Sequence, residues 1–211
     1  MSAPGAGAPP AVTLLLLTGG RSRRMGRDKA SMVVDGRPLG MRPVEALRAL
    51  VEEVVVAGHP VPGLEGRVVA DTVAGAGPLG GVVAGLGAAR TPLAVAVACD
   101  MPTLVPAVVA LLLARLDEHP ELLAACCEGP HGLEPLPLAL RAAAVAPLAA
   151  ALARGERALR PALAGARPGI VAEADWRGVD PEGRCFANWN RPEEVGGAIV
   201  DTDAALRYID R

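Results

Sequence analysis

The sequence predicts an α/β fold in which a mostly parallel central sheet is flanked by helices. Short, mainly apolar runs at 12–17, 54–57 and 93–98 are typical of strands buried on both faces of such a sheet. Segments with the apolar spacing of helices separate these runs, which is the alternation expected of an α/β domain. Apolar residues make up 51% of the chain and aromatic residues only 2%, so the core must consist mainly of Ala, Val and Leu.

The chain of 211 residues suits a single domain over 11–211, preceded by a flexible tail at 1–10 that is rich in Pro, Gly and Ala. The turn pair Asp35-Gly36 predicts a short hairpin between 31–34 and 37–39. The other expected elements are strands at 67–70, 122–126, 136–140 and 170–172, and helices at 41–53, 78–89, 106–116, 142–153, 156–163, from about 191, and 202–208.

Composition excludes several classes of protein. Lys and Arg total 21 against 23 Asp and Glu, and the formal net charge of −2 gives no broad basic surface, so we expect no nucleic-acid partner. The four cysteines form no CxxC pair and have no His at metal spacing, which favours free thiols. The N-terminus lacks the basic start of a signal peptide, and Asp100, Pro102 and Pro106 interrupt the longest apolar region. We therefore expect a cytoplasmic protein with no membrane partner.

A Gly-rich, cationic loop follows the first apolar run. It contains Gly19-Gly20, the cations Arg24 and Lys29, and Gly26. Backbone N–H groups next to glycine can approach phosphate oxygens closely, and Arg and Lys neutralise phosphate charge. The spacing fits neither the GxxxxGK[ST] phosphate loop nor the GxGxxG dinucleotide motif. The loop therefore indicates a nucleotide site of another type.

Two further features follow other predicted strands. Asp71 ends one strand and precedes a Gly-rich turn, in which Gly77 and Pro78 mark the start of a helix beneath a ligand. Asp100 follows the apolar run 93–98. Because ligands of parallel α/β sheets lie beyond the carboxyl ends of the strands, we expect both aspartates and the Gly-rich loop to meet at one edge.

These motifs together resemble those of the molybdenum cofactor guanylyltransferases, which are nucleotidyltransferases with a three-layer, GT-A-like Rossmann fold. Residues 15–30, LLLTGGRSRRMGRDKA, are similar to the family signature L-A-G-G-x-S-x-R-M-G-x-D-K-A. The resemblance continues in chain order through DTVAGAGPLGGVVAGL at 71–86, ACDMPTL at 98–104, EPL at 134–136 and FANWNRPEE at 186–194. The motifs thus cover nearly the whole chain.

The resemblance implies transfer of GMP from GTP to the terminal phosphate of molybdopterin, with release of pyrophosphate. The half of the chain up to about 105 would bind the nucleotide and the rest the acceptor. Asp100 would be catalytic and hold Mg²⁺, while Lys29 and Arg24 would stabilise the departing pyrophosphate. The backbone of Gly19 and Gly20 would cradle phosphates. The product would pass to a molybdoenzyme or a cofactor-insertion protein.

Other residues acquire roles from the same resemblance. Leu17, Thr18 and Gly19 would lie against the base, and Asp71 would contact the base or ribose. The full nucleotide set is Leu17, Thr18, Gly19, Gly20, Lys29, Asp71, Gly77, Pro78 and Asp100, and the acceptor set is Glu134, Asn188 and Asn190. Three residues depart from the family pattern: Thr18 replaces alanine, Ala57 replaces an asparagine, and Arg191 replaces threonine.

Alternatives remain at the level of both protein and residue. One is a cytidylyltransferase or other NTP transferase of the same fold acting on molybdopterin or another phosphorylated acceptor, although Gly19-Gly20 favours GTP. Another is a non-catalytic nucleotide-binding partner protein. Asp100 could instead cap a helix, as Asp often does. Trp176 and Trp189 could either line an acceptor pocket or fill the core.

Overall fold

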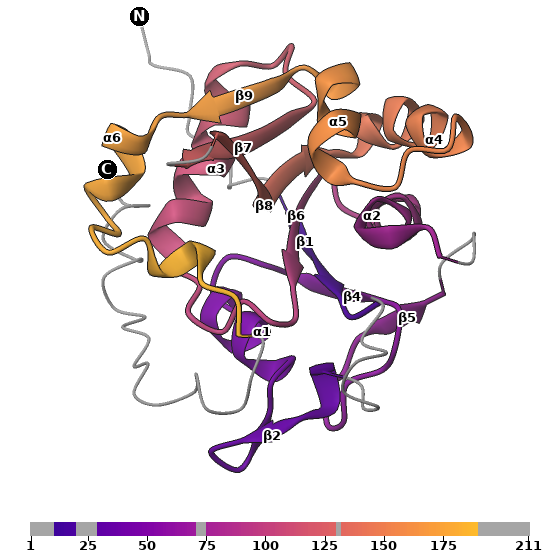
Figure 1. Cartoon of the computed structure of the whole chain (residues 1–211), viewed down its shortest axis with the longest axis vertical. Helices are drawn as coiled ribbons and strands as arrows, with labels where there is room; N and C mark the ends of the chain where they lie inside the picture. The colour runs from indigo at the N-terminus through magenta and orange to yellow at the C-terminus, as the bar shows by residue number, and fades with distance from the viewer. Residues whose placement is uncertain (1–10, 20–28, 71–74, 130–131, 190–211) are drawn as a thin grey trace, which may run out of the picture.

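A seven-stranded, mostly parallel sheet forms the centre of the protein (Figure 1). The computed structural model describes residues 11–19, 29–70, 75–129 and 132–189. The strand order is β5-β4-β1-β6-β8-β7-β9, and among the described strands of this sheet only β8 runs antiparallel to its neighbours. The strands are β1 (Val12–Leu17), β4 (Glu53–Ala57), β5 (Arg67–Val69), β6 (Leu93–Ala98), β7 (Ala124–Gly129), β8 (Gly132–Arg141) and β9 (Pro168–Val171).

Helices cover both faces of the sheet and complete the predicted three-layer α/β fold. The three on one face are α1 (Met41–Leu47), α3 (Pro106–Glu118) and α6 (Glu173–Arg177), and the three on the other are α2 (Gly77–Ala88), α4 (Val145–Ala153) and α5 (Leu159–Leu163). Short 3₁₀ helices occupy η2 (Lys29–Ser31), η3 (Ala142–Ala144), η4 (Ala164–Ala166) and η5 (Arg184–Phe186).

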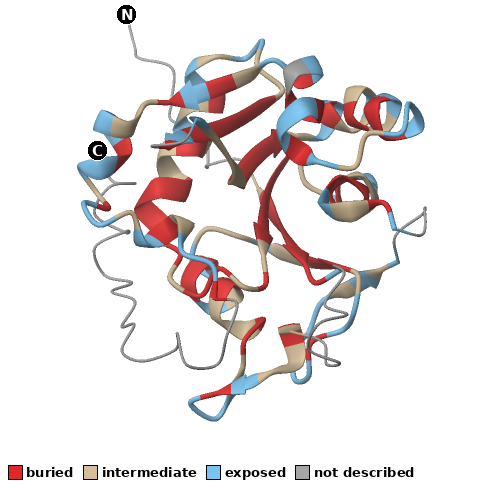
Figure 2. Ribbon diagram, viewed as in Figure 1, coloured by how far each residue is buried: buried red, intermediate tan, exposed pale blue. Residues whose placement is uncertain are grey.

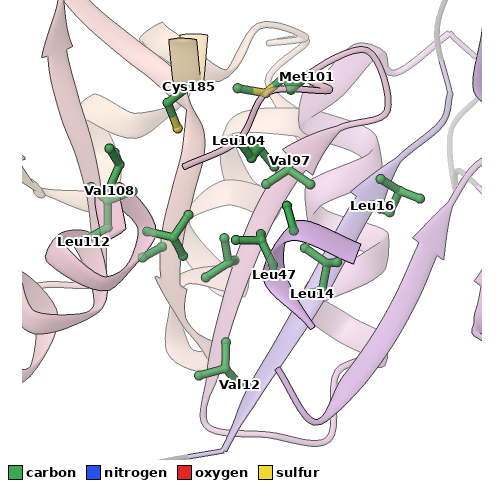
Figure 3. Packing of buried hydrophobic residues seen from close by; sticks show 14 of the residues in the cluster. Val12, Leu14, Leu16, Leu47, Val97, Met101, Leu104, Val108, Leu112 and Cys185 are labelled. Atoms are coloured by element: carbon green, nitrogen blue, oxygen red, sulfur yellow. The ribbon is translucent and has the colours of Figure 1, made fainter. Parts of the chain in front are cut away.

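The central strands β1 and β6 are almost wholly buried (Figure 2). Successive side chains of β1 point to opposite faces, so Leu14 and Leu16 enter the core beneath α1 and α3 (Figure 3), whereas Leu15 and Leu17 enter the core beneath α2 and α4. This double burial explains why the strand reads as a continuous apolar run rather than as an alternating one.

The carboxyl ends of β1, β4 and β6 lie side by side. Leu17 pairs with Ala57 on one side and with Ala98 on the other, both in parallel register. The residues that follow these strands therefore share one edge of the sheet. The predicted hairpin is also present, as β2 (Val33–Val34) and β3 (Arg37–Pro38), and it lies beyond α1 at the bottom of Figure 1.

Two predicted helices are too long, and each is shortened by hydrogen bonds that sequence periodicity does not reveal. The helix expected at 41–53 ends at Leu47, because the chain turns and the Glu52 N–H donates to the Val12 carbonyl before β4 begins. The helix expected at 156–163 starts only at Leu159. Before it, the Glu156 carboxylate accepts the N–H groups of the next two residues and holds them in a turn.

Other boundaries also shift. The strands expected at 122–126 and 136–140 are longer or displaced, as β7 and β8, and α6 was not predicted. The predicted tail at 1–10 and the helices expected from about 191 and at 202–208 lie outside the described residues. In the part of the chain that is described, no helix is both long and apolar enough to cross a bilayer.

The four cysteines are free and buried, as predicted. Cys126 and Cys127 lie on β7 on opposite faces of the sheet, within the two cores. Burial raises the pKa of the Cys126 thiol to about 12. The thiol therefore stays protonated at neutral pH and packs as a small apolar side chain.

A polar network ties the first residues of β4 to the neighbouring strands. Glu53 accepts hydrogen bonds from the Thr13 hydroxyl at 2.9 Å and the Arg90 N–H at 3.1 Å, and it pairs with the Arg67 guanidinium. Burial acts to raise the pKa of Glu53, but the Arg90 N–H, the Thr13 hydroxyl and Arg67 together lower it below its ordinary value. The ionised carboxylate is therefore the form that the folded state favours.

We expect Glu53→Gln to reduce the free energy of unfolding at pH 7 by about 2 kcal/mol, since hydrogen bonds to a charged group are lost. The pKa of Glu53 is lowered in the folded state, so its stabilisation is complete above the unfolded pKa and is lost as pH falls through the folded pKa. Urea unfolding at pH 7 and near pH 3 should show the difference between wild type and variant shrinking at low pH. Glu52→Gln, at an exposed neighbour, is the control.

Candidate active site

An ion pair between Lys29 and Asp100 lies at the carboxyl edge of the sheet. The Lys29 Nζ is 3.2 Å from Asp100 Oδ2, and the two side chains are 20% and 22% exposed. Asp100 follows the end of β6, whereas Lys29 begins η2. The predicted convergence of the Gly-rich loop and Asp100 at one edge is thus confirmed for these two residues, which are far apart in the sequence.

The cap role considered for Asp100 does not fit the structure. The residue that caps the following helix, α3, is Val105, and this helix start has no side-chain cap hydrogen bond. The Asp100 carboxylate faces Lys29 instead. A partly exposed carboxylate paired with a lysine can exchange that partner for a cation or for the solvent, so Asp100 is suited to ligand binding rather than to helix capping.

The end of β1 is fixed to β4 by short hydrogen bonds. The N–H groups of Thr18 and Gly19 both donate to the Ala57 carbonyl, at 3.0 and 3.2 Å. The buried Thr18 hydroxyl donates to the His59 carbonyl at 2.7 Å, with the Ala57 carbonyl at 3.2 Å. In this structure the Gly19 N–H is therefore used within the protein, and its role in cradling a phosphate stays a prediction.

The same contacts involve two residues that depart from the family pattern. Thr18, where the family has alanine, uses its hydroxyl to hold the loop after β4. Ala57, where an asparagine is usual, contributes its carbonyl rather than its side chain. The two residues are in direct contact where β1 ends, because Thr18 donates to the Ala57 carbonyl.

The start of α2 is covered by another loop. Gly77 has a φ of +66°, and a Cβ there would lie 2.8 Å from the Arg157 carbonyl oxygen, so only glycine fits without strain. That carbonyl accepts the Leu79 N–H at 3.3 Å. The sequence predicted that the first N–H groups of this helix face a ligand. One of them, the Leu79 N–H, is instead bonded within the protein, while Pro78 is exposed.

Two of the acceptor residues proposed from the sequence, Glu134 and Asn188, lie near the same edge. Glu134 lies on β8, whose pairing with β6 ends at Ala96–Leu138, so Glu134 extends beyond that pair toward the carboxyl end of β6. Its side chain packs against Gly129. Asn188 is exposed, and its Nδ2 donates to the Phe186 carbonyl at 3.3 Å.

Trp189, which the sequence suggested as either an acceptor-pocket or a core residue, lies against the Asp100 turn. Its N–H donates to the Asp100 carbonyl at 2.9 Å, which places the segment before residue 190 against the turn after β6. A second contact, from the Thr103 hydroxyl to the Arg184 carbonyl at 2.7 Å, holds the same two segments together. The position of Trp189 between Asn188 and Asn190 was the available signal, since both asparagines belong to a family motif.

Four predicted site residues lie outside the described residues: Gly20, Arg24, Asp71 and Asn190. Their roles, and the assignment of the other site residues to nucleotide, acceptor and metal, stay predictions. The described residues contain no group of three or more His, Cys, Asp or Glu placed to hold a metal ion. One carboxylate, here Asp100, nevertheless fits Mg²⁺, which commonly binds one or two carboxylates and completes its coordination with phosphate oxygens and water.

Comparison with known proteins places this geometry in a family. The family model described as the MobA-like NTP transferase domain matches residues 14–168. A probable molybdenum cofactor guanylyltransferase of Chloroflexus aggregans is 38% identical over 191 residues, which cover 86% of this chain and 90% of that protein. A molybdenum cofactor guanylyltransferase of Burkholderia vietnamiensis is 40% identical over 172 residues, covering 74% of this chain and 82% of that protein.

Solved structures share the fold. Molybdopterin-guanine dinucleotide biosynthesis protein A from Archaeoglobus fulgidus superposes with a TM-score of 0.72 at 22% identity, covering 94% of this chain and all of that one. A 2-C-methyl-D-erythritol 4-phosphate cytidylyltransferase from Thermus thermophilus gives 0.62 at 20% identity, covering 90% of this chain and 97% of that one. Because the family model covers well over half of the chain and the two relatives are 38% and 40% identical to it, the chain belongs to the MobA-like NTP transferase family.

Proposed function

We propose that this protein transfers GMP from GTP to the terminal phosphate of molybdopterin and releases pyrophosphate. The observation that carries the proposal is the Lys29–Asp100 pair at the carboxyl edge of the sheet. Relatives at 38% and 40% identity that bear the guanylyltransferase name support the choice of nucleotide and acceptor. Transfer of a nucleotidyl group requires charge neutralisation and alignment more than covalent catalysis, and this pair supplies both signs of charge.

Asp100 would hold the catalytic metal, for which we propose Mg²⁺. When bound, the metal would neutralise the phosphate oxygens of the nucleotide. Lys29, released from Asp100, would donate to the departing pyrophosphate. Its side chain is 20% exposed and its Nζ is 3.2 Å from Asp100 Oδ2, so Lys29 is within reach of a ligand bound at Asp100. Arg24 would add a second cation to the leaving group, and Glu134, Asn188 and Asn190 would contact the acceptor.

The proposal is tested by incubating the purified protein with molybdopterin, Mg²⁺ and each labelled NTP in turn, and by measuring pyrophosphate together with the dinucleotide product. We expect GTP to be used at least about tenfold more efficiently than CTP, ATP or UTP, since a base-specific site rejects a wrongly hydrogen-bonding base strongly. EDTA should abolish turnover and Mg²⁺ should restore it.

Other results of this incubation would assign a different function to the protein. Efficient use of CTP would identify a cytidylyltransferase, and product formed only with another phosphorylated acceptor would change the substrate. Binding of GTP, seen as a raised melting temperature, without release of pyrophosphate in any mixture would identify a non-catalytic nucleotide-binding protein.

A further inference from the structure

Trp189 connects the two segments that carry the ion pair of the site. Its main-chain N–H donates to the Asp100 carbonyl at 2.9 Å. Trp189 is 8% exposed and forms a small apolar cluster with Val34 and Leu39 of the hairpin region, separate from the two main cores. Figure 1 shows this last described part of the chain, in yellow, close to α1. One residue thus contacts both the Asp100 turn and the hairpin.

The hairpin is in turn bound to the Lys29 segment. The Leu39 N–H donates to the Met32 carbonyl at 2.7 Å, and the Gly40 N–H donates to the Ala30 carbonyl at 3.0 Å. The Met32 N–H completes the link by donating to the Lys29 carbonyl at 3.1 Å. Three main-chain hydrogen bonds thus link the hairpin to the segment that carries Lys29.

Arg42 holds the indole in place. The guanidinium carbon lies 5.3 Å from the centroid of the Trp189 ring, within the range of a cation–π contact. Its Nη2 donates to Asp35 Oδ2 at 2.7 Å and to the Val34 carbonyl at 3.4 Å, so the hairpin fixes the guanidinium. Within the described residues its Nε is buried without a hydrogen-bond partner. In the conformation that places Arg42 over the Trp189 ring, its Nε thus makes no hydrogen bond to a described residue.

We propose that Trp189 is a positioning residue that sets the distance between Lys29 and Asp100, with Arg42 holding its ring. The proposal rests on the proposed function, in which Asp100 holds the metal and Lys29 assists the leaving group. Catalysis by alignment is sensitive to placement, and a shift of about 1 Å can lower a rate about a hundredfold. The main-chain bond to Asp100 and the contact of the indole with the hairpin hold both partners through one residue.

Trp189→Ala and Trp189→Phe test the role. We expect Trp189→Ala to lower kcat at least about tenfold, to change the KM for GTP about twofold or less, and to raise the Mg²⁺ concentration that gives half-maximal activity. Trp189→Phe keeps an aromatic ring and should recover most of the activity. Arg42→Met should resemble a mild form of Trp189→Ala.

Trp176→Phe is the matched control. Trp176 is 1% exposed, has Arg177 over its ring at 4.8 Å and donates its Nε1–H to the Glu128 carbonyl, but none of these partners carries the ion pair. This variant should lower the melting temperature without changing the Mg²⁺ dependence. If Trp176→Phe shifts the Mg²⁺ dependence as Trp189→Ala does, or if Trp189→Ala shifts neither kcat nor the Mg²⁺ dependence, the positioning role is wrong.

A second readout does not depend on turnover. The chain contains only two tryptophans, so the Trp176→Phe variant reports fluorescence from Trp189 alone. Addition of Mg²⁺ with GTP should change that fluorescence, and Asp100→Asn in the same background should remove the change. Unchanged fluorescence in a protein that binds Mg²⁺ and GTP by calorimetry would overturn the proposal. If the wild type transfers no nucleotide, the proposed function fails, yet this measurement still decides whether Trp189 senses the Asp100 site.

Discussion

Asp100→Asn is expected to lower kcat about 10²–10³-fold, the scale of losing one preorganised electrostatic group at a reacting centre. Asn keeps the shape of the side chain but removes the negative charge that would hold the metal and that now pairs with Lys29. Stability should change by less than about 1 kcal/mol, because a partly exposed ion pair contributes little. Steady-state kinetics over a Mg²⁺ titration measure the change in kcat, and urea unfolding measures the change in stability.

The choice of Asn makes this test specific. Asn caps helices about as well as Asp, so a residue that only satisfied backbone groups would tolerate the change. Asp117→Asn, the same chemical change at an exposed site on α3, is the control and should leave kcat within about twofold, as surface substitutions usually have small effects. Retention of more than a tenth of wild-type turnover by Asp100→Asn would refute the metal role.

Gly58→Ala is expected to reduce the free energy of unfolding by about 3 kcal/mol, as the sum of backbone strain and a steric clash. Gly58 has a φ of +121°, and a Cβ there would lie 2.5 Å from the Gly19 nitrogen and 2.9 Å from Thr18 Oγ1. Relief of the clash must move the end of β1 away from β4. The midpoint of urea unfolding should fall, and the affinity for GTP should fall with it because the nucleotide loop begins there.

Gly63→Ala separates the two contributions. Gly63 also has a positive φ, +77°, but a Cβ there meets no atom within 4 Å. This variant should therefore show only the backbone strain, about 1 kcal/mol, and unchanged GTP affinity. Equal destabilisation by the two substitutions would mean that the close approach of Gly58 to the end of β1 has no energetic consequence.

The sequence predicted the parts of the fold that depend on burial alone. The bounds of β1 and β6 agree with the runs at 12–17 and 93–98, because a strand covered on both faces consists mainly of apolar side chains. The sequence also identified candidate site residues, since a Gly-rich cationic loop and an aspartate after a strand have distinct chemistry. Their meeting at one edge follows from the parallel order of the strands.

The sequence did not predict the ends of elements that are set by long-range contacts. The early end of α1 depends on the Glu52 N–H finding the Val12 carbonyl, and the late start of α5 on the turn held by Glu156. Helical periodicity continues through both segments, so a local pattern cannot report where tertiary hydrogen bonds replace helical ones. The insertion of β8 between β6 and β7 likewise depends on pairing rather than on pattern.

By itself, then, the sequence determined the α/β class, the family motifs and the two charged residues of the site. Tertiary structure decided how those residues are held: the Ala57 carbonyl takes the Gly19 N–H, the Arg157 carbonyl takes the Leu79 N–H at the start of α2, and the Asp100 carbonyl takes the Trp189 N–H. All three acceptors are main-chain carbonyls, which every residue carries. Such bonds leave no signature in the side chains, and only the folded chain brings their partners together.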